Sequence, residues 1–152
     1  MPDKYEPGSH NAPGIAGLLA GVEWILERGV ESLWKHEQLL MKLMLDGLRA
    51  IAGLRVLGPQ TIEHRCGVFS MTLEGMEPAE LASVLEVEYG ILARAGLHCA
   101  PRAHESLGTR AGGGATRLSL GPFLTEDDIR FATDALAEIA RSMAAAGSGA
   151  AR

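Results

Sequence analysis

The sequence predicts an α+β fold in which a small, mostly antiparallel sheet is covered by helices. Two long stretches with helical spacing of apolar residues come first, and several short strand-like stretches follow them. A further helical stretch closes the chain, and segments in this order are typical of a layered α+β domain. The length of 152 residues suits one domain. We place it at residues 14–143, between an extended lead at residues 1–13 and a disordered tail at residues 144–152.

The two N-terminal helices are predicted at residues 14–28 and 31–52. Both have apolar residues at helical intervals, and a glycine that stops the helix follows each of them, Gly29 and Gly53. The apolar face of the first helix covers much of its circumference, so we expect it to associate with another apolar surface. The residues of that face are Ile15, Leu18, Leu19, Val22, Ile25 and Leu26.

The strands are predicted where the apolar period changes to two. Residues 66–73 alternate, so Phe69 and Met71 share one face of a strand while Ser70 and Thr72 share the other. The remaining strands are expected at residues 54–57, 91–95 and 115–120. A loop at residues 96–114 is expected between the last two of them.

Two more helices are predicted among and after these strands. Pro78 occupies a favourable first helical position, and the helix that it opens ends near Gly90. The last helix begins after Thr125, which forms a capping box with Asp128 three residues later. Its apolar residues then recur at intervals of three and four as far as Met143.

Composition and charge exclude several classes of protein. A formal net charge of −5 argues against a nucleic-acid surface, although the arginines clustered at residues 94–117 could hold a small anion. The apolar run at residues 15–26 is interrupted by Glu23 and is too short to span a bilayer, so we expect no membrane segment. Two distant cysteines without a secretory signal indicate free thiols and a cytoplasmic protein.

Cys99 is the leading candidate for a reactive residue. It lies in a loop segment rich in glycine, proline and cationic residues, with His98 immediately before it and Arg94 nearby. A free thiol has an ordinary pKa near 8.5, and nearby cations favour the nucleophilic thiolate. The alternative for an isolated cysteine is a small buried hydrophobe, which is our interpretation of Cys66. The spacing of Cys99, His98 and His104 matches no standard zinc pattern, so we predict no metal site.

Two further segments could bind anions. Arg117 alternates with Leu118 and Leu120 in a predicted strand, so it points away from the face that the leucines bury. An arginine in that position can make a two-pronged contact with a carboxylate, although a solvated surface arginine has the same pattern. In the lead, Gly8 and Ser9 offer donors that could hold a phosphate, or they form only a polar turn.

Taken together, these segments resemble the C-terminal part of class V aminotransferase-type enzymes, most closely the cysteine desulfurase and selenocysteine lyase group. The resemblance extends over residues 5–140 and rests on four stretches. Residues 94–100, with Cys99, are similar to the catalytic-cysteine loop of that group. The other three are the lead Glu6-Pro7-Gly8-Ser9-His10-Asn11, the pair Gly58-Pro59 with the strand at Cys66, and the closing strand and helix at residues 114–120 and 123–128.

The resemblance implies a fold and a role for each site residue. It implies the small C-terminal domain of fold-type I pyridoxal phosphate enzymes. Cys99 would take the sulfur of a cysteine substrate to give a persulfide and alanine, and Arg117 would grip the substrate carboxylate. Ser9 would help to bind the cofactor phosphate across a dimer interface. Arg94 and His98 would position the loop.

The resemblance also implies partners, and it raises one conflict. The group uses pyridoxal phosphate bound to a lysine, and none of the three lysines, Lys4, Lys35 and Lys42, matches that lysine. We therefore expect the chain to be inactive alone and to need a homodimer or an N-terminal cofactor domain. Its substrate would be L-cysteine or selenocysteine, with a sulfur-acceptor protein as partner. Alternatives are a stand-alone sulfur-carrier or partner-binding module, and a class V aminotransferase-like domain with an incidental Cys99.

Overall fold

The computed structural model of this chain describes Tyr5 and residues 8–149, with side chains as far as Ala146. Five helices and four strands lie within the described residues. The chain groups into two units, residues 1–36 and residues 37–152. The second unit contains all four strands, and the boundary between the units falls inside one helix, α2 (Val30–Arg49).

The N-terminal unit contains helix α1 (Ala12–Arg28), which begins two residues earlier than the sequence predicts. Asn11 causes the earlier start, because its side-chain oxygen accepts a hydrogen bond from the Gly14 N–H at 3.1 Å. Gly29 ends the helix with a φ of 79°, as its position in the sequence predicts. No residue of α1 is buried, and its large apolar side chains are 40–71% exposed.

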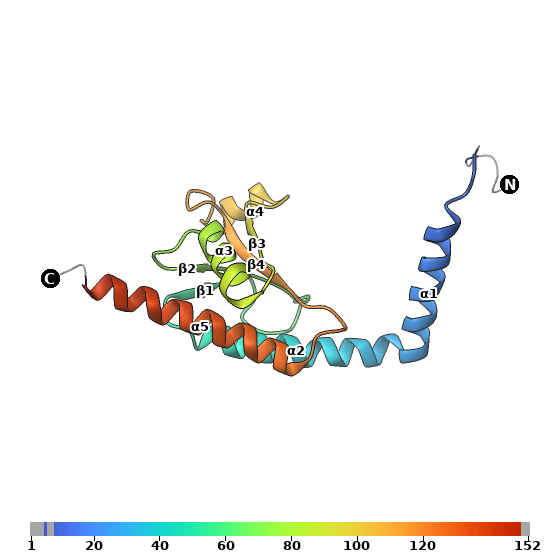
Figure 1. Cartoon of the computed structure of the whole chain (residues 1–152), viewed down its shortest axis with the longest axis horizontal. Coiled ribbons are helices and arrows are strands. Elements are labelled where there is room, and N and C mark those ends of the chain that lie inside the picture. Colours follow the sequence, from blue (N-terminus) through green and yellow to red (C-terminus); the bar gives the residue numbers. More distant parts are fainter. Residues whose placement is uncertain (1–4, 6–7, 150–152) are drawn as a thin grey trace. The chain divides into compact units, whose positions relative to one another are not determined.

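The sheet has four strands in the order β1-β2-β4-β3, and every neighbouring pair is antiparallel (Figure 1). The structure therefore confirms the antiparallel sheet. The strands are β1 (Leu54–Val56), β2 (Val68–Leu73), β3 (Arg94–Gly96) and β4 (Ala115–Ser119). The third strand starts three residues later than predicted, because residues 91–93 pair with no described strand and the Ile91 N–H instead donates to the Leu85 carbonyl of the preceding helix at 2.9 Å.

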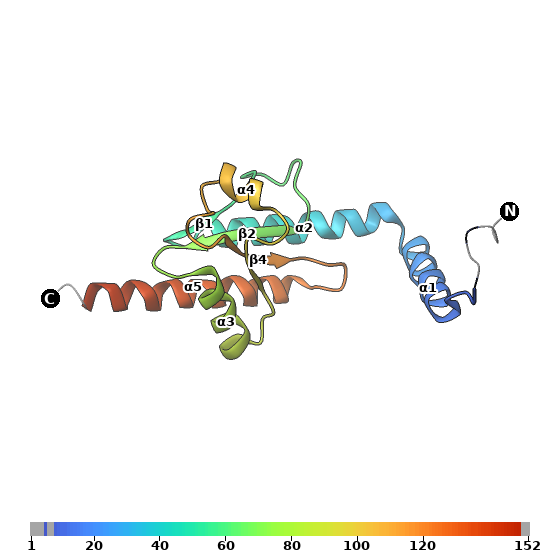
Figure 2. The ribbon, with the colours of Figure 1, turned by 90° about the horizontal axis from the view of Figure 1, so that it is seen from above.

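Helices cover one face of this sheet and form the core with it. Figures 1 and 2 show α2 and α5 (Glu126–Gly149) side by side beneath the strands, and α3 (Pro78–Tyr89) packs against β3 and β4. Gly47 permits the close approach of α2 and α5, since a Cβ there would lie 2.6 Å from the methyl carbon of Thr133. The fully buried large side chains are Leu40, Met41, Met44, Leu48, Phe69, Met71, Leu81, Leu85, Ile129 and Leu136.

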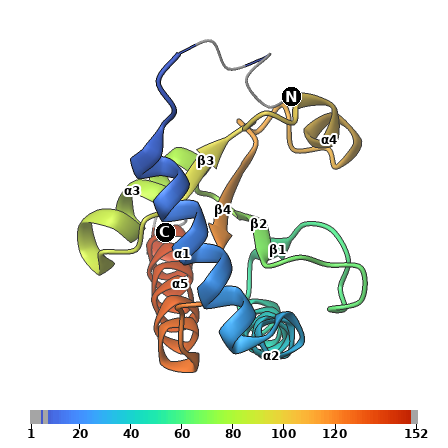
Figure 3. The same cartoon turned by 90° about the vertical axis from the view of Figure 1, so that its right-hand side faces the viewer.

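The opposite face of the sheet is polar. Phe69 and Met71 of β2 point into the core, so Ser70 between them points to the other face, as the alternation predicts. The short helix α4 (Pro101–Ser106) lies on this other side of the sheet from α5 in Figure 3. The Arg55 side chain reaches across the same face and donates to the Leu107 carbonyl at 2.8 Å. This face therefore keeps polar side chains beside α4.

Three further features differ from the sequence prediction. Helix α4 lies inside the predicted loop at residues 96–114; at six residues it is too short to show a period, and Pro101 is its only signal. Helix α5 continues to Gly149, so residues 144–149 of the predicted tail are helical, in keeping with the high helix propensity of alanine. Cys66 is exposed rather than buried, because it precedes β2 and has the parity of Val68, which is also exposed, and not that of the buried Phe69.

None of the helices among the described residues has the length and the apolar content needed to cross a membrane.

Candidate functional site

Cys99 lies in the turn that joins β3 to α4. It is exposed and forms no disulfide. The turn is closed by a hydrogen bond from the Ala100 N–H to the Leu97 carbonyl at 3.2 Å, and Pro101 then starts α4. Glycine and proline thus place the thiol on a short, closed turn between two regular elements. The sequence predicts this accessibility.

His98, next to this thiol, has an unusual backbone conformation. Its φ of 53° lies in the left-handed region, which residues other than glycine seldom adopt. The ring Nε2 is 3.2 Å from the Arg94 carbonyl, and the ring stacks on His104 with 5.8 Å between centroids. Burial, more than the neighbouring charges of Arg117, His104 and Arg94, lowers the pKa of His98 from its ordinary value of 6.5. His98 is therefore neutral at pH 7.

Arg94 and Arg117 face each other across the β3–β4 pair. They are direct partners in the antiparallel register, and Ser70 of β2 is the partner of Arg117 on its other side. Residues directly opposite in such a pair project from the same face of the sheet, and like charges there destabilise the pair. The arrangement therefore favours an anion that could neutralise both arginines.

Arg117 has an unsatisfied donor. Its Nε atom is buried and has no hydrogen-bond partner among the described residues. A buried donor without a partner is costly, so such atoms are uncommon unless a ligand or water satisfies them. The side chain of Arg117 is thus ready to bind an acceptor that the described residues do not provide.

A close backbone crossing connects the Cys99 turn to the arginine strand. Gly96, the last residue of β3, lies opposite Ala115, and a Cβ on Gly114 would be only 2.2 Å from the Gly96 carbonyl oxygen. Gly114 also has a φ of 99°, which only glycine adopts without strain. Because Gly114 has no side chain, its segment can lie in direct contact with the backbone of Gly96 and Leu97.

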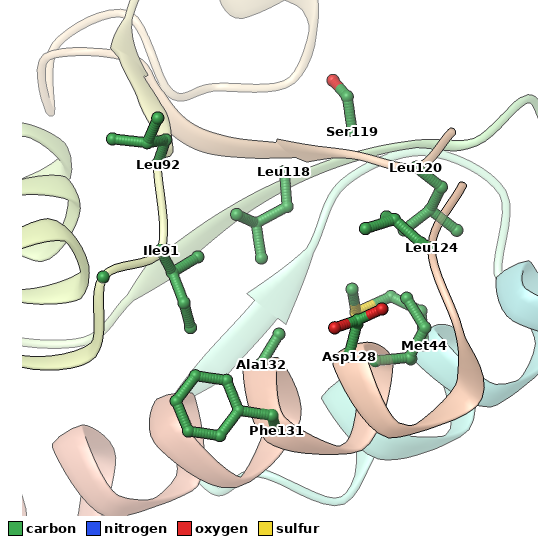
Figure 4. A pocket seen from close by; sticks show the side chains of 12 residues that line it. Met44, Ile91, Leu92, Leu118, Ser119, Leu120, Leu124, Asp128, Phe131 and Ala132 are labelled. Atoms are coloured by element: carbon green, nitrogen blue, oxygen red, sulfur yellow. The ribbon is translucent and has the colours of Figure 1, made fainter. Parts of the chain in front are cut away.

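A hollow lies on the core side of the sheet and is lined by none of the predicted site residues. It has a volume of about 360 Å³ and lies between β4, the segment after α3 and the start of α5. Figure 4 shows Leu118, Leu120 and Leu124 directed toward it, whereas Ser119 points away. Arg117 shares the parity of Ser119, so the two faces of β4 separate the apolar hollow from the cationic site.

The comparisons with known proteins decide the family. The family model described as Aminotransferase class-V matches residues 1–131. This chain belongs to the class V aminotransferase family. Its relatives include a protein of Methanothermobacter thermautotrophicus named a probable cysteine desulfurase, which is 31% identical over 92% of this chain and 34% of its own length.

Solved structures of cysteine desulfurases share the fold of this class V chain. The apo cysteine desulfurase of Thermococcus onnurineus NA1 matches 93% of this chain and 34% of its own, with a TM-score of 0.84 and 26% identity. The cysteine desulfurase CsdA of Escherichia coli, in an S-sulfonic acid form, matches 94% of this chain and 34% of its own, with a TM-score of 0.76 and 27% identity. The chain thus spans about a third of the length of the relatives that it matches.

The structure brings four of the five predicted site residues into one region of the class V domain. Arg94, His98, Cys99 and Arg117 lie on β3, the following turn and β4. Ser9 belongs to the N-terminal unit, where it is exposed just before α1, and Glu6 and Pro7 of the same motif lie outside the described residues. A role for Ser9 in phosphate binding therefore stays a prediction.

Two residues that support this region have weak sequence signals. His104 is 4% exposed, and its Nδ1 is 2.7 Å from the Thr109 hydroxyl. Arg65 is 8% exposed and donates to the carbonyls of Pro59, Val68 and Leu57. From a sequence alone, polar residues are predicted to be exposed. Only the position of His104 in the cluster after Cys99 could have indicated its burial.

Among the described residues, no three histidine, cysteine, aspartate or glutamate side chains gather as metal ligands.

Proposed function

We propose that this chain provides the sulfur-accepting cysteine and the carboxylate-binding arginine of a cysteine desulfurase-type enzyme. Cys99 is the nucleophile, and Arg117 holds the substrate carboxylate. As a sulfur–sulfur bond to Cys99 forms, the substrate carbon–sulfur bond breaks, and the carbon takes up the electron pair and then a proton to give alanine. L-cysteine is the expected substrate, and selenocysteine would react by the same chemistry.

The unsatisfied Nε of Arg117 is the observation that carries this proposal. Arg117 lies in β4, and its direct partner on β3 is another arginine, Arg94. The exposed Cys99 lies three residues after the end of β3. A planar guanidinium with a free donor suits a carboxylate, and a second cation nearby increases the attraction for an anionic amino acid. The similarity to proteins named as cysteine desulfurases supports the same substrate class.

The described lysines do not fit the cofactor of the family, pyridoxal phosphate. Lys35 pairs with Glu31 at 2.8 Å and Lys42 pairs with Asp46 at 2.6 Å, each on the exposed surface of α2. A lysine that binds this cofactor needs a site for the ring and its phosphate, and neither side chain has one. Lys4 lies outside the described residues. We therefore propose that the cofactor lysine comes from outside residues 1–152.

The remaining partners follow from the same proposal. A domain that binds the cofactor would have to meet the polar face of the sheet, and a sulfur-acceptor protein would have to reach the exposed Cys99. A homodimer would bring Ser9 toward a partner's cofactor site. Both cysteines are free thiols, which suits a reducing compartment such as the cytoplasm.

Selective alkylation tests the proposed site in the whole chain. Iodoacetate carries a carboxylate and iodoacetamide does not, so their rate ratio measures the attraction of the site for a carboxylate. Cys66 is a matched control because it is also exposed and follows an arginine, whose donors are used by carbonyls. We expect the ratio at Cys99 to exceed that at Cys66 by roughly threefold or more, and R117Q to remove most of the excess.

Equal ratios at the two cysteines would overturn the proposal and favour an incidental Cys99. A separate activity measurement addresses the cofactor. The chain with added pyridoxal phosphate and L-cysteine should release no sulfide above a C99A control, since the described lysines do not fit the cofactor. Clear release would contradict the assignment of the cofactor lysine to residues outside the chain.

A further inference from the structure

The buried pair of His104 and Thr109 lies directly behind the turn that carries Cys99. The two residues are 4% and 5% exposed, and the His104 Nδ1 and Thr109 Oγ1 are 2.7 Å apart. The His104 ring stacks on His98, with 5.8 Å between centroids and 24° between planes. A buried polar pair in contact with the residue next to a candidate nucleophile can hold that residue in place.

Backbone hydrogen bonds attach the same pair to the arginine strand. The His104 carbonyl accepts from the N–H groups of Thr109, at 2.9 Å, and Arg110, at 3.2 Å. The Thr109 carbonyl in turn accepts from the Gly114 N–H at 2.9 Å, one residue before β4 begins. His104 is thus linked on one side to the Cys99 turn and on the other to the strand that carries Arg117.

His98 needs such support because of its backbone. A left-handed conformation at a residue other than glycine costs free energy, so a contact that favours it contributes to the stability of the turn. Within the described part of the chain, the His98 ring contacts the Arg94 carbonyl at one edge and stacks on the His104 ring at one face. The charged and titratable groups near His98 include the adjacent Cys99 thiol, Arg94 on β3, Arg117 on β4 and His104 on α4.

We infer that His104 is a positioning residue for Cys99. Its ring holds His98 in the left-handed conformation, and this fixes the turn so that the thiol stays beside the paired arginines. The Thr109 hydroxyl fixes the orientation of the His104 ring. The effect of His104 on the chemistry of Cys99 rests on the proposed function, but the support of the turn by His104 can be measured without it.

Two readouts in the full chain test the inference. The first is hydrogen exchange at the Ala100 amide, which closes the Cys99 turn. The second is the ratio of iodoacetate to iodoacetamide alkylation at Cys99. We expect H104N, which keeps a polar partner for Thr109 but lacks the ring, to speed Ala100 exchange by roughly tenfold. The same variant should lower the alkylation ratio by roughly threefold.

A double variant and a remote variant separate positioning from general stability. H104F/T109V keeps a ring beside His98 and removes both buried polar partners together, so it should restore slow exchange and most of the alkylation ratio. Ile139 is buried in α5, and I139V lowers stability without contact to the turn. We expect I139V to leave both readouts as in the unsubstituted chain.

The outcomes distinguish this inference from the proposed function. Unchanged Ala100 exchange in H104N, or no recovery in H104F/T109V, would overturn the positioning role whatever the alkylation ratio is. If exchange responds as expected but Cys99 of the unsubstituted chain shows no preference for iodoacetate, the positioning role stands and the proposed function fails. A preference that H104N leaves unchanged would show that the arginines act without the His104 support, and would overturn the functional part of the inference.

Discussion

His98 connects the electrostatics of the site to the pH dependence of stability. Its ring is half-buried, and burial is the largest cause that lowers its pKa below 6.5. Its neighbours Arg94 and Arg117 act in the same direction, whereas the Arg94 carbonyl opposes them. A neutral ring can stack on His104 without charge repulsion. The neutral state of His98 is therefore part of the geometry around Cys99.

Acidification should destabilise the protein through this histidine. Below pH 6.5 the unfolded chain binds a proton at His98 that the folded chain does not, so the free energy of unfolding falls until the pH passes the lowered pKa. Above pH 6.5 both states are neutral and this contribution is constant. Urea unfolding at pH 7.5 and 5.5 should show a smaller loss in H98Q. The exposed His64 provides the control, and an H64Q variant with an equal effect would contradict the assignment.

At the residue scale, the sequence predicts the reactive residues better than it predicts the residues that hold them in place. The cationic neighbours of Cys99 and the alternation around Arg117 are local patterns, and the structure brings these residues into one region. The stack of His104 on His98 depends on how a six-residue helix folds back, which has no local period. The prediction that Cys66 is buried was wrong because its parity places it with the exposed Val68, on the side of β2 opposite the core.

At the element scale, the crossing of Gly96 and Gly114 should tolerate no side chain. In G114A the new Cβ would lie 2.2 Å from the Gly96 carbonyl oxygen, at a φ of 99° that disfavours any Cβ. We expect a loss of more than about 2 kcal/mol in the free energy of unfolding, because neither backbone can move without breaking the β3–β4 pair. Chemical denaturation of the purified variant measures the loss.

The matched control for this prediction is G121A. Gly121 has no heavy atom within 4 Å of an added Cβ and no positive φ. Its replacement should change the free energy of unfolding by no more than about 0.5 kcal/mol. Similar losses in the two variants would show that the crossing is not a fixed contact.

The start of α5 offers a second test at this scale. The Thr125 hydroxyl and N–H both donate to the Asp128 carboxylate at 2.7 Å, and the Asp128 N–H donates to the Thr125 hydroxyl oxygen at 3.3 Å. T125A removes the cap and should cost about 1 kcal/mol in thermal or urea unfolding. T125S keeps the hydroxyl and should remain close to the original stability. A T125A variant as stable as T125S would contradict the role of the cap.

The elements themselves follow from the sequence where they are long or capped. The capping box at Thr125 and the glycine stop at Gly29 are local signals, and both occur where the sequence places them. The ends differ where tertiary contacts decide them. Residues 91–93 are apolar, but no neighbouring strand pairs with them, and β3 is therefore restricted to Arg94–Gly96.

At the scale of the whole molecule, α1 determines how the chain meets other surfaces. Leu18 and Leu26 are 68% and 71% exposed, and no residue of the helix is buried. We expect concentration-dependent association of the purified chain. L18E should weaken that association by roughly tenfold or more, because it places a charge in the apolar contact. It should leave the unfolding midpoint of the sheet unit unchanged, since Leu18 is not buried.

Sedimentation of the chain over a range of concentrations measures this association. E27Q, on the same helix but outside its apolar face, is the matched control and should associate as the original chain does. A chain that stays monomeric at high concentration would contradict the prediction. Exposure of this face was predictable from the breadth of the apolar stripe, but the sequence alone does not reveal which of the two long helices contributes to the core.

The two edges of the sheet limit the form that association can take. Each edge strand, β1 and β3, has only three residues and includes one arginine, Arg55 or Arg94. Short, charged edges are poor templates for a strand from another molecule. Copies of this chain should therefore join through helices into assemblies of finite size, and should not extend the sheet from molecule to molecule into fibrils.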